Sequence, residues 1–140
     1  MQGFREQGAA LQKKVLVITD NKSHADKDKA ALRRIDLEMS AAVPSCDQAV
    51  EHLSNEECDI IILDTIISDT DAKTCLKRIK GMPEAKDIPV VMVTLVSDRN
   101  NVLDAVSGGC SGYILRPYSL ETFERHINTA LQLVRFNEIE

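Results

Sequence analysis

Apolar residues gather in short runs that polar or turn-forming residues interrupt. Uninterrupted apolar runs of about four to eight residues are typical of strands buried on both faces, as in the middle of a parallel sheet. The clearest runs lie at 15–18 and 60–63, and each leads into an acid, Asp20 and Asp64. Further strands are expected at 88–94 and 113–115, with a weaker one at 40–43 that Pro44 stops.

Between these strands, apolar residues recur at helical spacing in otherwise polar stretches. This pattern predicts amphipathic helices over 24–39, 45–55, 72–81, 98–108 and 119–134. Ser45 followed by Gln48 has the spacing of a capping box, and Ser119 is a good N-cap.

Strands and helices alternate along the whole chain, which predicts an α/β fold with a doubly wound, five-stranded parallel sheet and five helices on its two faces. In a flavodoxin-like strand order, 2-1-3-4-5, the first and third strands are neighbours, so Asp20 and Asp64 would lie side by side. We expect a flexible arm at 1–12, one domain at 13–135 and a short tail at 136–140.

The charge balance excludes some classes of partner. With 17 basic and 22 acidic residues among 140, the net charge of −5 gives no electrostatic case for binding nucleic acid or an anionic membrane. No apolar run approaches the length of a membrane span, and the first residues lack the apolar core of a signal peptide. A cytoplasmic protein is expected.

Cysteine and histidine give no sign of a metal centre. The four cysteines are widely spaced without a C-x-x-C pair, so four reduced thiols are expected. The three histidines are scattered. His24 could approach the acidic edge, but we expect it to be a solvated loop residue.

Four positions at strand ends occur together in one known family. Asp20 follows the first strand, Asp64 the third, Thr94 the fourth, and the basic residue Arg116 precedes a proline after the fifth. In this order and spacing, the chain from about residue 13 to 134 resembles the receiver domain of two-component response regulators.

The resemblance implies a phosphorylation site. Asp64 would accept a phosphoryl group from a histidine kinase or phosphotransfer protein, and Mg²⁺ would be held by Asp20, Asp64 and the backbone carbonyl of Ile66. A carboxylate attacks an anionic phosphoryl donor poorly unless such a cation screens the repulsion.

The resemblance also implies roles beyond the acceptor. Thr94 and Arg116 would sense the phosphoryl group, and Tyr113 would be the switch aromatic. The expected function is phosphorelay signalling rather than catalysis. Its output would be contact with a downstream protein through the fourth helix, fifth strand and fifth helix, and a homodimer is possible.

Several residues depart from the family pattern around this site. They are Thr19 in place of a further acid, Arg116 in place of lysine, Leu95 in place of a small residue, and Ser68 and Ala72 in the loop after the acceptor. One carboxylate fewer predicts weak or absent Mg²⁺ binding, and a planar guanidinium does not reproduce a compact ammonium.

Two other interpretations therefore stay open. In the first, the chain is a pseudo-receiver, an unphosphorylated interaction or dimerisation module in which Arg116 forms an ion pair with Asp64 in place of the metal. The second, less favoured, is a haloacid-dehalogenase-like phosphatase. That chemistry needs an acid two residues after the nucleophile, where this chain has Ile66.

Overall fold

The computed structural model describes residues 13–95 and 108–139, with side-chain surroundings through residue 132. Its five strands are β1 (Lys14–Ile18), β2 (Glu38–Val43), β3 (Ile60–Asp64), β4 (Val90–Thr94) and β5 (Gly112–Leu115). They form one parallel sheet in the order β2-β1-β3-β4-β5, which confirms the predicted topology.

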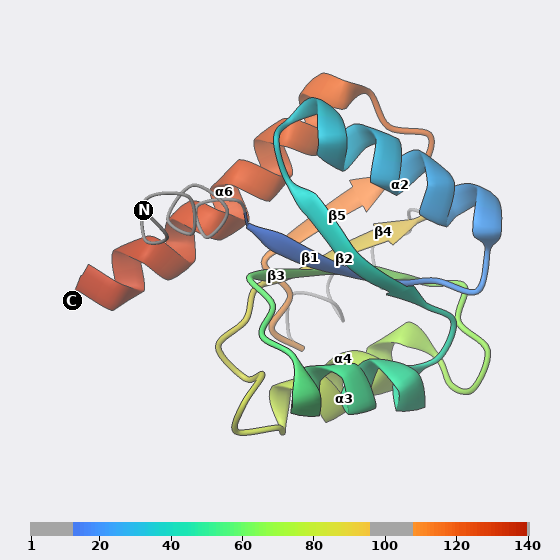
Figure 1. The fold of residues 1–140 in the computed structure, drawn as a ribbon, viewed down its shortest axis with the longest axis vertical. Helices are drawn as coiled ribbons and strands as arrows, with labels where there is room; N and C mark the ends of the chain where they lie inside the picture. The colour runs from blue at the N-terminus through green and yellow to red at the C-terminus, as the bar shows by residue number, and fades with distance from the viewer. Residues whose placement is uncertain (1–12, 96–107, 140) are drawn as a thin grey trace, which may run out of the picture.

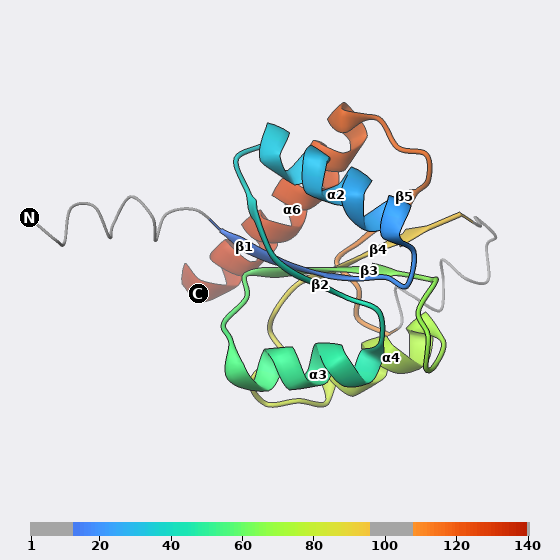
Figure 2. The same ribbon diagram turned by 45° about the vertical axis from the view of Figure 1, so that its right-hand side comes forward.

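Helices cover both faces of this sheet (Figure 1). The described helices are α2 (Lys22–Arg34), α3 (Cys46–Asn55), α4 (Ala72–Lys80) and α6 (Leu120–Ile139). Figure 2 shows α2 and α6 together on one face and α3 with α4 on the other. The helix predicted at 98–108 and the arm at 1–12 fall essentially outside the described residues.

The central strands are buried on both faces, as their apolar runs predict. Every residue of β3 and β4 is buried. Alternate residues of β3 belong to different clusters: Ile61 and Leu63 pack with α3 and α4, whereas Ile60 and Ile62 pack with α2 and α6. Burying one such side chain fully stabilises the fold by about 1.5–3 kcal/mol.

The helix predicted over 24–39 is displaced in the structure. Asn21 caps α2 by accepting a hydrogen bond from the backbone of His24, and the helix ends at Arg34. Asp36 then adopts a φ of 65°, a left-handed turn that short polar residues tolerate. The chain reverses there, and Met39 pairs with Val15 in the sheet instead of extending the helix.

Polar caps fix the starts of the other helices. Ser45 accepts from the backbone N–H of Gln48 at 3.1 Å, and Ser119 accepts from Thr122 at 3.1 Å, as expected for N-caps. Asp71 caps α4 by accepting from the backbone of Thr74. Helix α6 continues to Ile139, beyond the apolar face expected to end at 134.

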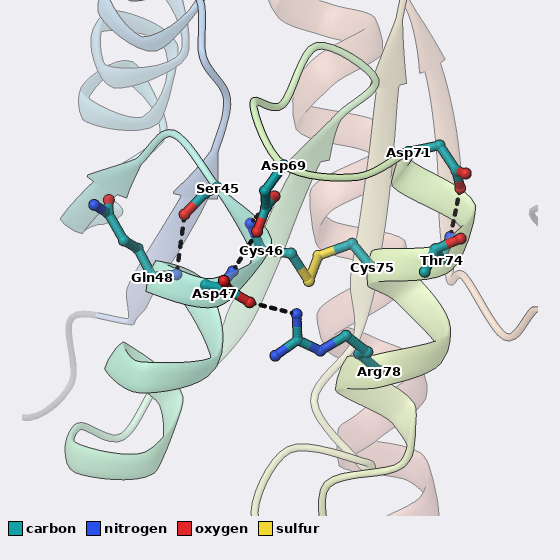
Figure 3. Close-up of a disulfide and its surroundings, with 9 residues drawn as sticks. All are labelled: Ser45, Cys46, Asp47, Gln48, Asp69, Asp71, Thr74, Cys75 and Arg78. Atoms are coloured by element: carbon teal, nitrogen blue, oxygen red, sulfur yellow. Dashed lines mark hydrogen bonds and ion pairs between the residues drawn. A yellow bond between two sulfur atoms is a disulfide. The ribbon is translucent and has the colours of Figure 1, made fainter.

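A disulfide joins α3 to α4 (Figure 3). The prediction of four reduced thiols is wrong for Cys46 and Cys75, which are bonded and fully buried; Cys58 and Cys110 are free. The two helices lie side by side on one face of the sheet, and this brings the paired Cα atoms within 5.6 Å although they are 29 positions apart.

Polar contacts surround the disulfide. Arg78 of α4 forms an ion pair with Asp47 of α3 at 2.7 Å, and the carboxylate of Asp69 accepts from the backbone N–H groups of Cys46 and Asp47 (Figure 3). The loop between β3 and α4 is thereby tied to the start of α3. None of the described helices is both long and apolar enough to cross a membrane.

Candidate functional site

The candidate site lies where parallel strands end at one edge of the sheet, the usual ligand edge of such folds. Thr19 follows β1, Asp64 ends β3, Thr94 ends β4, and Arg116 follows β5. In the structure, Thr19 and Arg116 both donate hydrogen bonds to Asp64. To these it adds His24 from α2, which the sequence did not assign to the site.

The carboxylate of Asp64 is fully buried, and each of its two oxygens has a hydrogen-bond partner. Its Oδ1 accepts a hydrogen bond from the backbone N–H of Ile66 at 3.0 Å. Its Oδ2 accepts from the Thr19 hydroxyl at 2.9 Å and from Arg116 Nη2 at 3.2 Å, and lies 2.6 Å from His24 Nδ1. These donors satisfy a buried charge that would otherwise be costly.

Arg116 is shared between two buried carboxylates. Its Nη1 and Nη2 donate to the two oxygens of Asp28 at 3.0 and 2.8 Å, in the bidentate geometry that a guanidinium allows. The Tyr118 hydroxyl donates to Asp28 Oδ1 at 2.6 Å. His24, Asp28, Asp64, Arg116 and Tyr118 form one hydrogen-bonded unit, which we call the buried ion cluster.

Burial and neighbouring charge act together on the pKa values of Arg116 and Tyr118. Burial alone would lower the pKa of Arg116, but the hydrogen bonds and charge of Asp28, with the charge of Asp64, raise it. Arg116 therefore stays cationic. Burial raises the pKa of Tyr118, and the Asp28 carboxylate that accepts a hydrogen bond from its hydroxyl raises it further. Tyr118 therefore stays a neutral donor.

Asp20 lies at the same edge but outside the cluster. Its side chain is exposed, and among the described residues its carboxylate has no hydrogen-bond or ion-pair partner. Its backbone N–H donates to the carbonyl of Ile66 at 2.6 Å. The three predicted Mg²⁺ ligands, Asp20, Asp64 and Ile66, are therefore neighbours.

Their arrangement does not fit Mg²⁺. The ion needs several free oxygen ligands, but Oδ2 of Asp64 is surrounded by Thr19, His24 and Arg116, and the carbonyl of Ile66 accepts from the backbone of Asp20. Arg116 brings a positive charge to within 3.2 Å of Asp64, where a metal would be repelled. In the part of the chain that the structure describes, no three His, Cys, Asp or Glu side chains gather as a metal site.

The predicted sensing residues lie nearby. Thr94 is buried, with its hydroxyl 3.2 Å from that of Thr65, and its carbonyl accepts from the backbone N–H of Arg116 at 2.7 Å. The guanidinium of Arg116 lies on Asp64 and Asp28. Tyr113 is half-buried and packs against the core beneath α3 and α4. None of these positions by itself assigns a sensing or switching role.

The remaining departures from the family pattern have separate surroundings. The backbone of Ser68 donates to the carbonyl of Pro44 at 2.9 Å, and Ala72 is the buried first residue of α4. Leu95 is 54% exposed. Leu95 does not cover Asp64, which is enclosed by hydrogen-bonding groups, but lines an open pocket beside it.

That pocket has a volume of about 430 Å³. Three of its lining residues are apolar or aromatic, namely Leu95, Pro117 and Tyr118. The other three carry or can acquire a positive charge, namely His24, Lys27 and Arg116. The buried ion cluster forms its inner wall. A pocket of this size and composition suits a small anion.

Sequence reasoning missed His24 and Asp28. His24 is not a solvated loop residue but lies in the first turn of α2 and is 8% exposed, and Asp28, one turn later, is fully buried. One signal was present: both share the helix face that carries the buried Leu32. Ionisable residues on an apolar helix face require buried partners.

Comparison with known proteins agrees with this fold. Residues 15–128 match the family model described as the response regulator receiver domain. The chain belongs to the response regulator receiver family. Receiver domains are signalling domains of two-component systems, so this assignment places the chain in that class.

This receiver domain is distant from its known relatives. It is 24% identical over 115 residues to the chemotaxis protein CheY-3 of Vibrio cholerae, covering 82% of this chain and 88% of that protein. It is 27% identical over 117 residues to the transcriptional regulatory protein ZraR of Escherichia coli, covering 84% of this chain but 26% of ZraR. The similarity to ZraR therefore concerns one part of a longer protein.

Solved structures show the same architecture. A CheY-like response regulator receiver domain protein from Methanospirillum hungatei has a TM-score of 0.80 at 18% identity, with 90% of this chain and 98% of that one covered. A two-component response regulator from Clostridium difficile has a TM-score of 0.77 at 26% identity, with 86% and 97% covered. These structures share the receiver fold of this chain.

Proposed function

We propose that this chain is a pseudo-receiver, a receiver domain that signals through protein contacts while Asp64 stays unphosphorylated in the buried ion cluster. The observation that carries the proposal is the position of Arg116, whose Nη2 lies 3.2 Å from Asp64 Oδ2. A nucleophilic carboxylate needs a free lone pair and an open approach. Asp64 lacks the open approach, since it is fully buried, and its Oδ2 is crowded by Thr19, His24 and Arg116.

The cluster also opposes a metal-assisted reaction energetically. For Mg²⁺ to reach Asp64, Arg116 would have to leave, and Asp28 would then lose its bidentate partner in the interior. Breaking a buried ion pair costs about 3–5 kcal/mol. Arg116 and His24 both lie on Asp64 Oδ2, so the family's Mg²⁺ is not part of our proposal.

The proposed output is contact with another protein. Two of the three elements expected to form that surface, β5 and α6, lie within the described residues. Leu95 and Leu115 are large apolar side chains that are 54% and 46% exposed beside them. In this proposal the two leucines contribute apolar contacts to a protein partner, which includes a second copy of this chain.

A second candidate is a phosphorylated receiver that takes its phosphoryl group from a histidine kinase or phosphotransfer protein. One observation favours it: Asp20, with an unpartnered carboxylate among the described residues, directly adjoins Ile66 and Asp64 at the ligand edge. This candidate requires a second conformation in which Arg116 and His24 release Asp64. A phosphatase is not proposed, because Ile66 supplies only a backbone N–H where an acid is needed.

One experiment separates the two candidates. Amide spectra of the ¹⁵N-labelled chain are recorded with Mg²⁺ and beryllofluoride, a mimic of the phosphoryl group, for the wild type and for D64N. The pseudo-receiver predicts no saturable shifts at the amides of Asp64, Ile66 and Thr94. Saturable shifts in the wild type that D64N abolishes would establish the phosphorylated receiver instead.

A further inference from the structure

The imidazole of His24 lies between the buried carboxylate of Asp64 and the open pocket. Its Nδ1 is 2.6 Å from Asp64 Oδ2. A carboxylate only accepts hydrogen bonds, so Nδ1 carries the proton. In the neutral ring Nε2 then holds the lone pair. Within the described part of the chain Nε2 has no hydrogen-bond partner, and His24 lines the pocket.

The pocket also supplies a cation for an anionic substrate. Lys27 lines it, is exposed, and has no hydrogen-bond or ion-pair partner among the described residues. It follows His24 by three positions on α2, a spacing that places both side chains on one helix face. The Nη groups of Arg116 are committed to Asp28 and Asp64, so Lys27 is the ammonium left for a ligand.

We propose that His24 Nε2 is a phosphoryl acceptor, modified by high-energy phosphoryl donors such as phosphoramidates and acyl phosphates. The inference rests on the proposed function, because His24 remains on Asp64 only while Asp64 itself is unmodified. In this proposal the nucleophile is the imidazole of His24, and the carboxylate of Asp64 supports it. A carboxylate that orients the other nitrogen is the usual way to fix a reactive histidine.

The transfer balances without a proton acceptor. The Nε2 lone pair forms the new P–N bond, while the bond from phosphorus to the donor breaks and its electron pair leaves with the donor group. An acyl phosphate releases a carboxylate; a phosphoramidate releases ammonia after protonation by water. The ring keeps its Nδ1 proton and becomes a cation.

Each neighbour has a role in this step. The positive charge that develops on the ring is offset by Asp64 at 2.6 Å from Nδ1. The phosphoryl oxygens, which carry about −1.5 to −2 charges at neutral pH, are met by Lys27 at the pocket wall. Arg116 and Thr19 hold the Asp64 carboxylate in place through its Oδ2.

The test uses the wild-type chain, whose three histidines provide an internal control. The chain is treated with potassium phosphoramidate and, separately, with acetyl phosphate, and the modified residue is located by tandem mass spectrometry. We expect His24 to be modified faster than His52 and His126 by roughly tenfold or more, and the three rates to converge in urea. The product should be acid-labile and resistant to hydroxylamine, unlike an acyl phosphate.

Variants test the assigned groups. H24N keeps an amide nitrogen as far from Cβ as Nδ1 and can still donate to Asp64, but lacks Nε2, so it should lose the modification. H52N should keep it. K27A should slow the modification several-fold, while K29A, at an exposed position of α2 outside the pocket, should not. Circular dichroism and thermal melting establish that each variant is folded.

Three results would overturn the inference. The first is equal modification of all three histidines in the folded chain, and the second is no modification by either donor; both leave the pseudo-receiver proposal intact. The third is a hydroxylamine-labile product that D64N abolishes, which would show phosphorylation of Asp64 and contradict both proposals. A purely structural His24 predicts the first or second result, with no effect of K27A.

Discussion

Arg116 and Asp28, 88 positions apart in the sequence, form a bidentate ion pair with N–O distances of 3.0 and 2.8 Å in the interior of the domain. The pair fixes α2 to the segment after β5. It also fixes the direction of the guanidinium, whose Nη2 reaches Asp64 at 3.2 Å. Asp28 of α2 therefore positions the positive charge of Arg116 beside Asp64. No sequence motif links α2 to Asp64.

Loss of Asp28 should destabilise the domain strongly. D28N removes one charge of a fully buried pair and leaves Arg116 with only Asp64 as a charged partner. We expect the free energy of unfolding in urea to fall by about 3–5 kcal/mol. D26N, at an exposed position of the same helix, should change it by less than about 0.5 kcal/mol. Equal effects of the two variants would show that the buried pair is energetically unimportant.

Tyr118 gives a pH-dependent test. Its folded-state pKa is raised by burial and by Asp28. The contribution of Tyr118 to the free energy of unfolding is therefore present below the ordinary tyrosine pKa of about 10, and it is lost as the pH rises toward the folded-state pKa. Absorbance titration should show one of the two tyrosines ionising late in the folded chain. Y118F should remove the late step and lower stability at neutral pH by about 1.5–3 kcal/mol. A late step that persists in Y118F would refute the assignment.

The disulfide can be tested by thiol counting and by unfolding. Two of the four cysteines should react with a thiol reagent in the denatured, unreduced chain, and four after reduction. Closing a loop of this length, with Cys46 and Cys75 at a sequence separation of 29, should stabilise the fold by about 3–4 kcal/mol over the reduced form. Reaction of all four thiols before reduction would contradict the pairing.

The architecture follows from local patterns in the sequence. The runs at 15–18 and 60–63 are buried on both faces because an uninterrupted apolar strand has no polar side to expose, and Ser45 caps α3 as its spacing predicts. The end of α2 was not predicted, because the left-handed turn at Asp36 depends on the pairing of Met39 in the sheet.

The sequence predicts only those site residues that lie at the ends of strands. Asp64 and Arg116 were placed together by topology, and the ion pair between them was one of two arrangements that the sequence left open. His24 and Asp28 were missed because their role depends on which face of α2 meets the sheet edge. The pairing of Cys46 with Cys75 was missed because it depends on how α3 and α4 pack together.

We propose that Arg116 and His24, rather than a metal ion, hold the Asp64 carboxylate. The most direct measurement is a crystal structure of the chain grown with excess Mg²⁺. We expect Arg116 Nη2 and His24 Nδ1 within hydrogen-bond distance of Asp64, and no Mg²⁺ there. Mg²⁺ bound between Asp20 and Asp64, with Arg116 turned away, would contradict it.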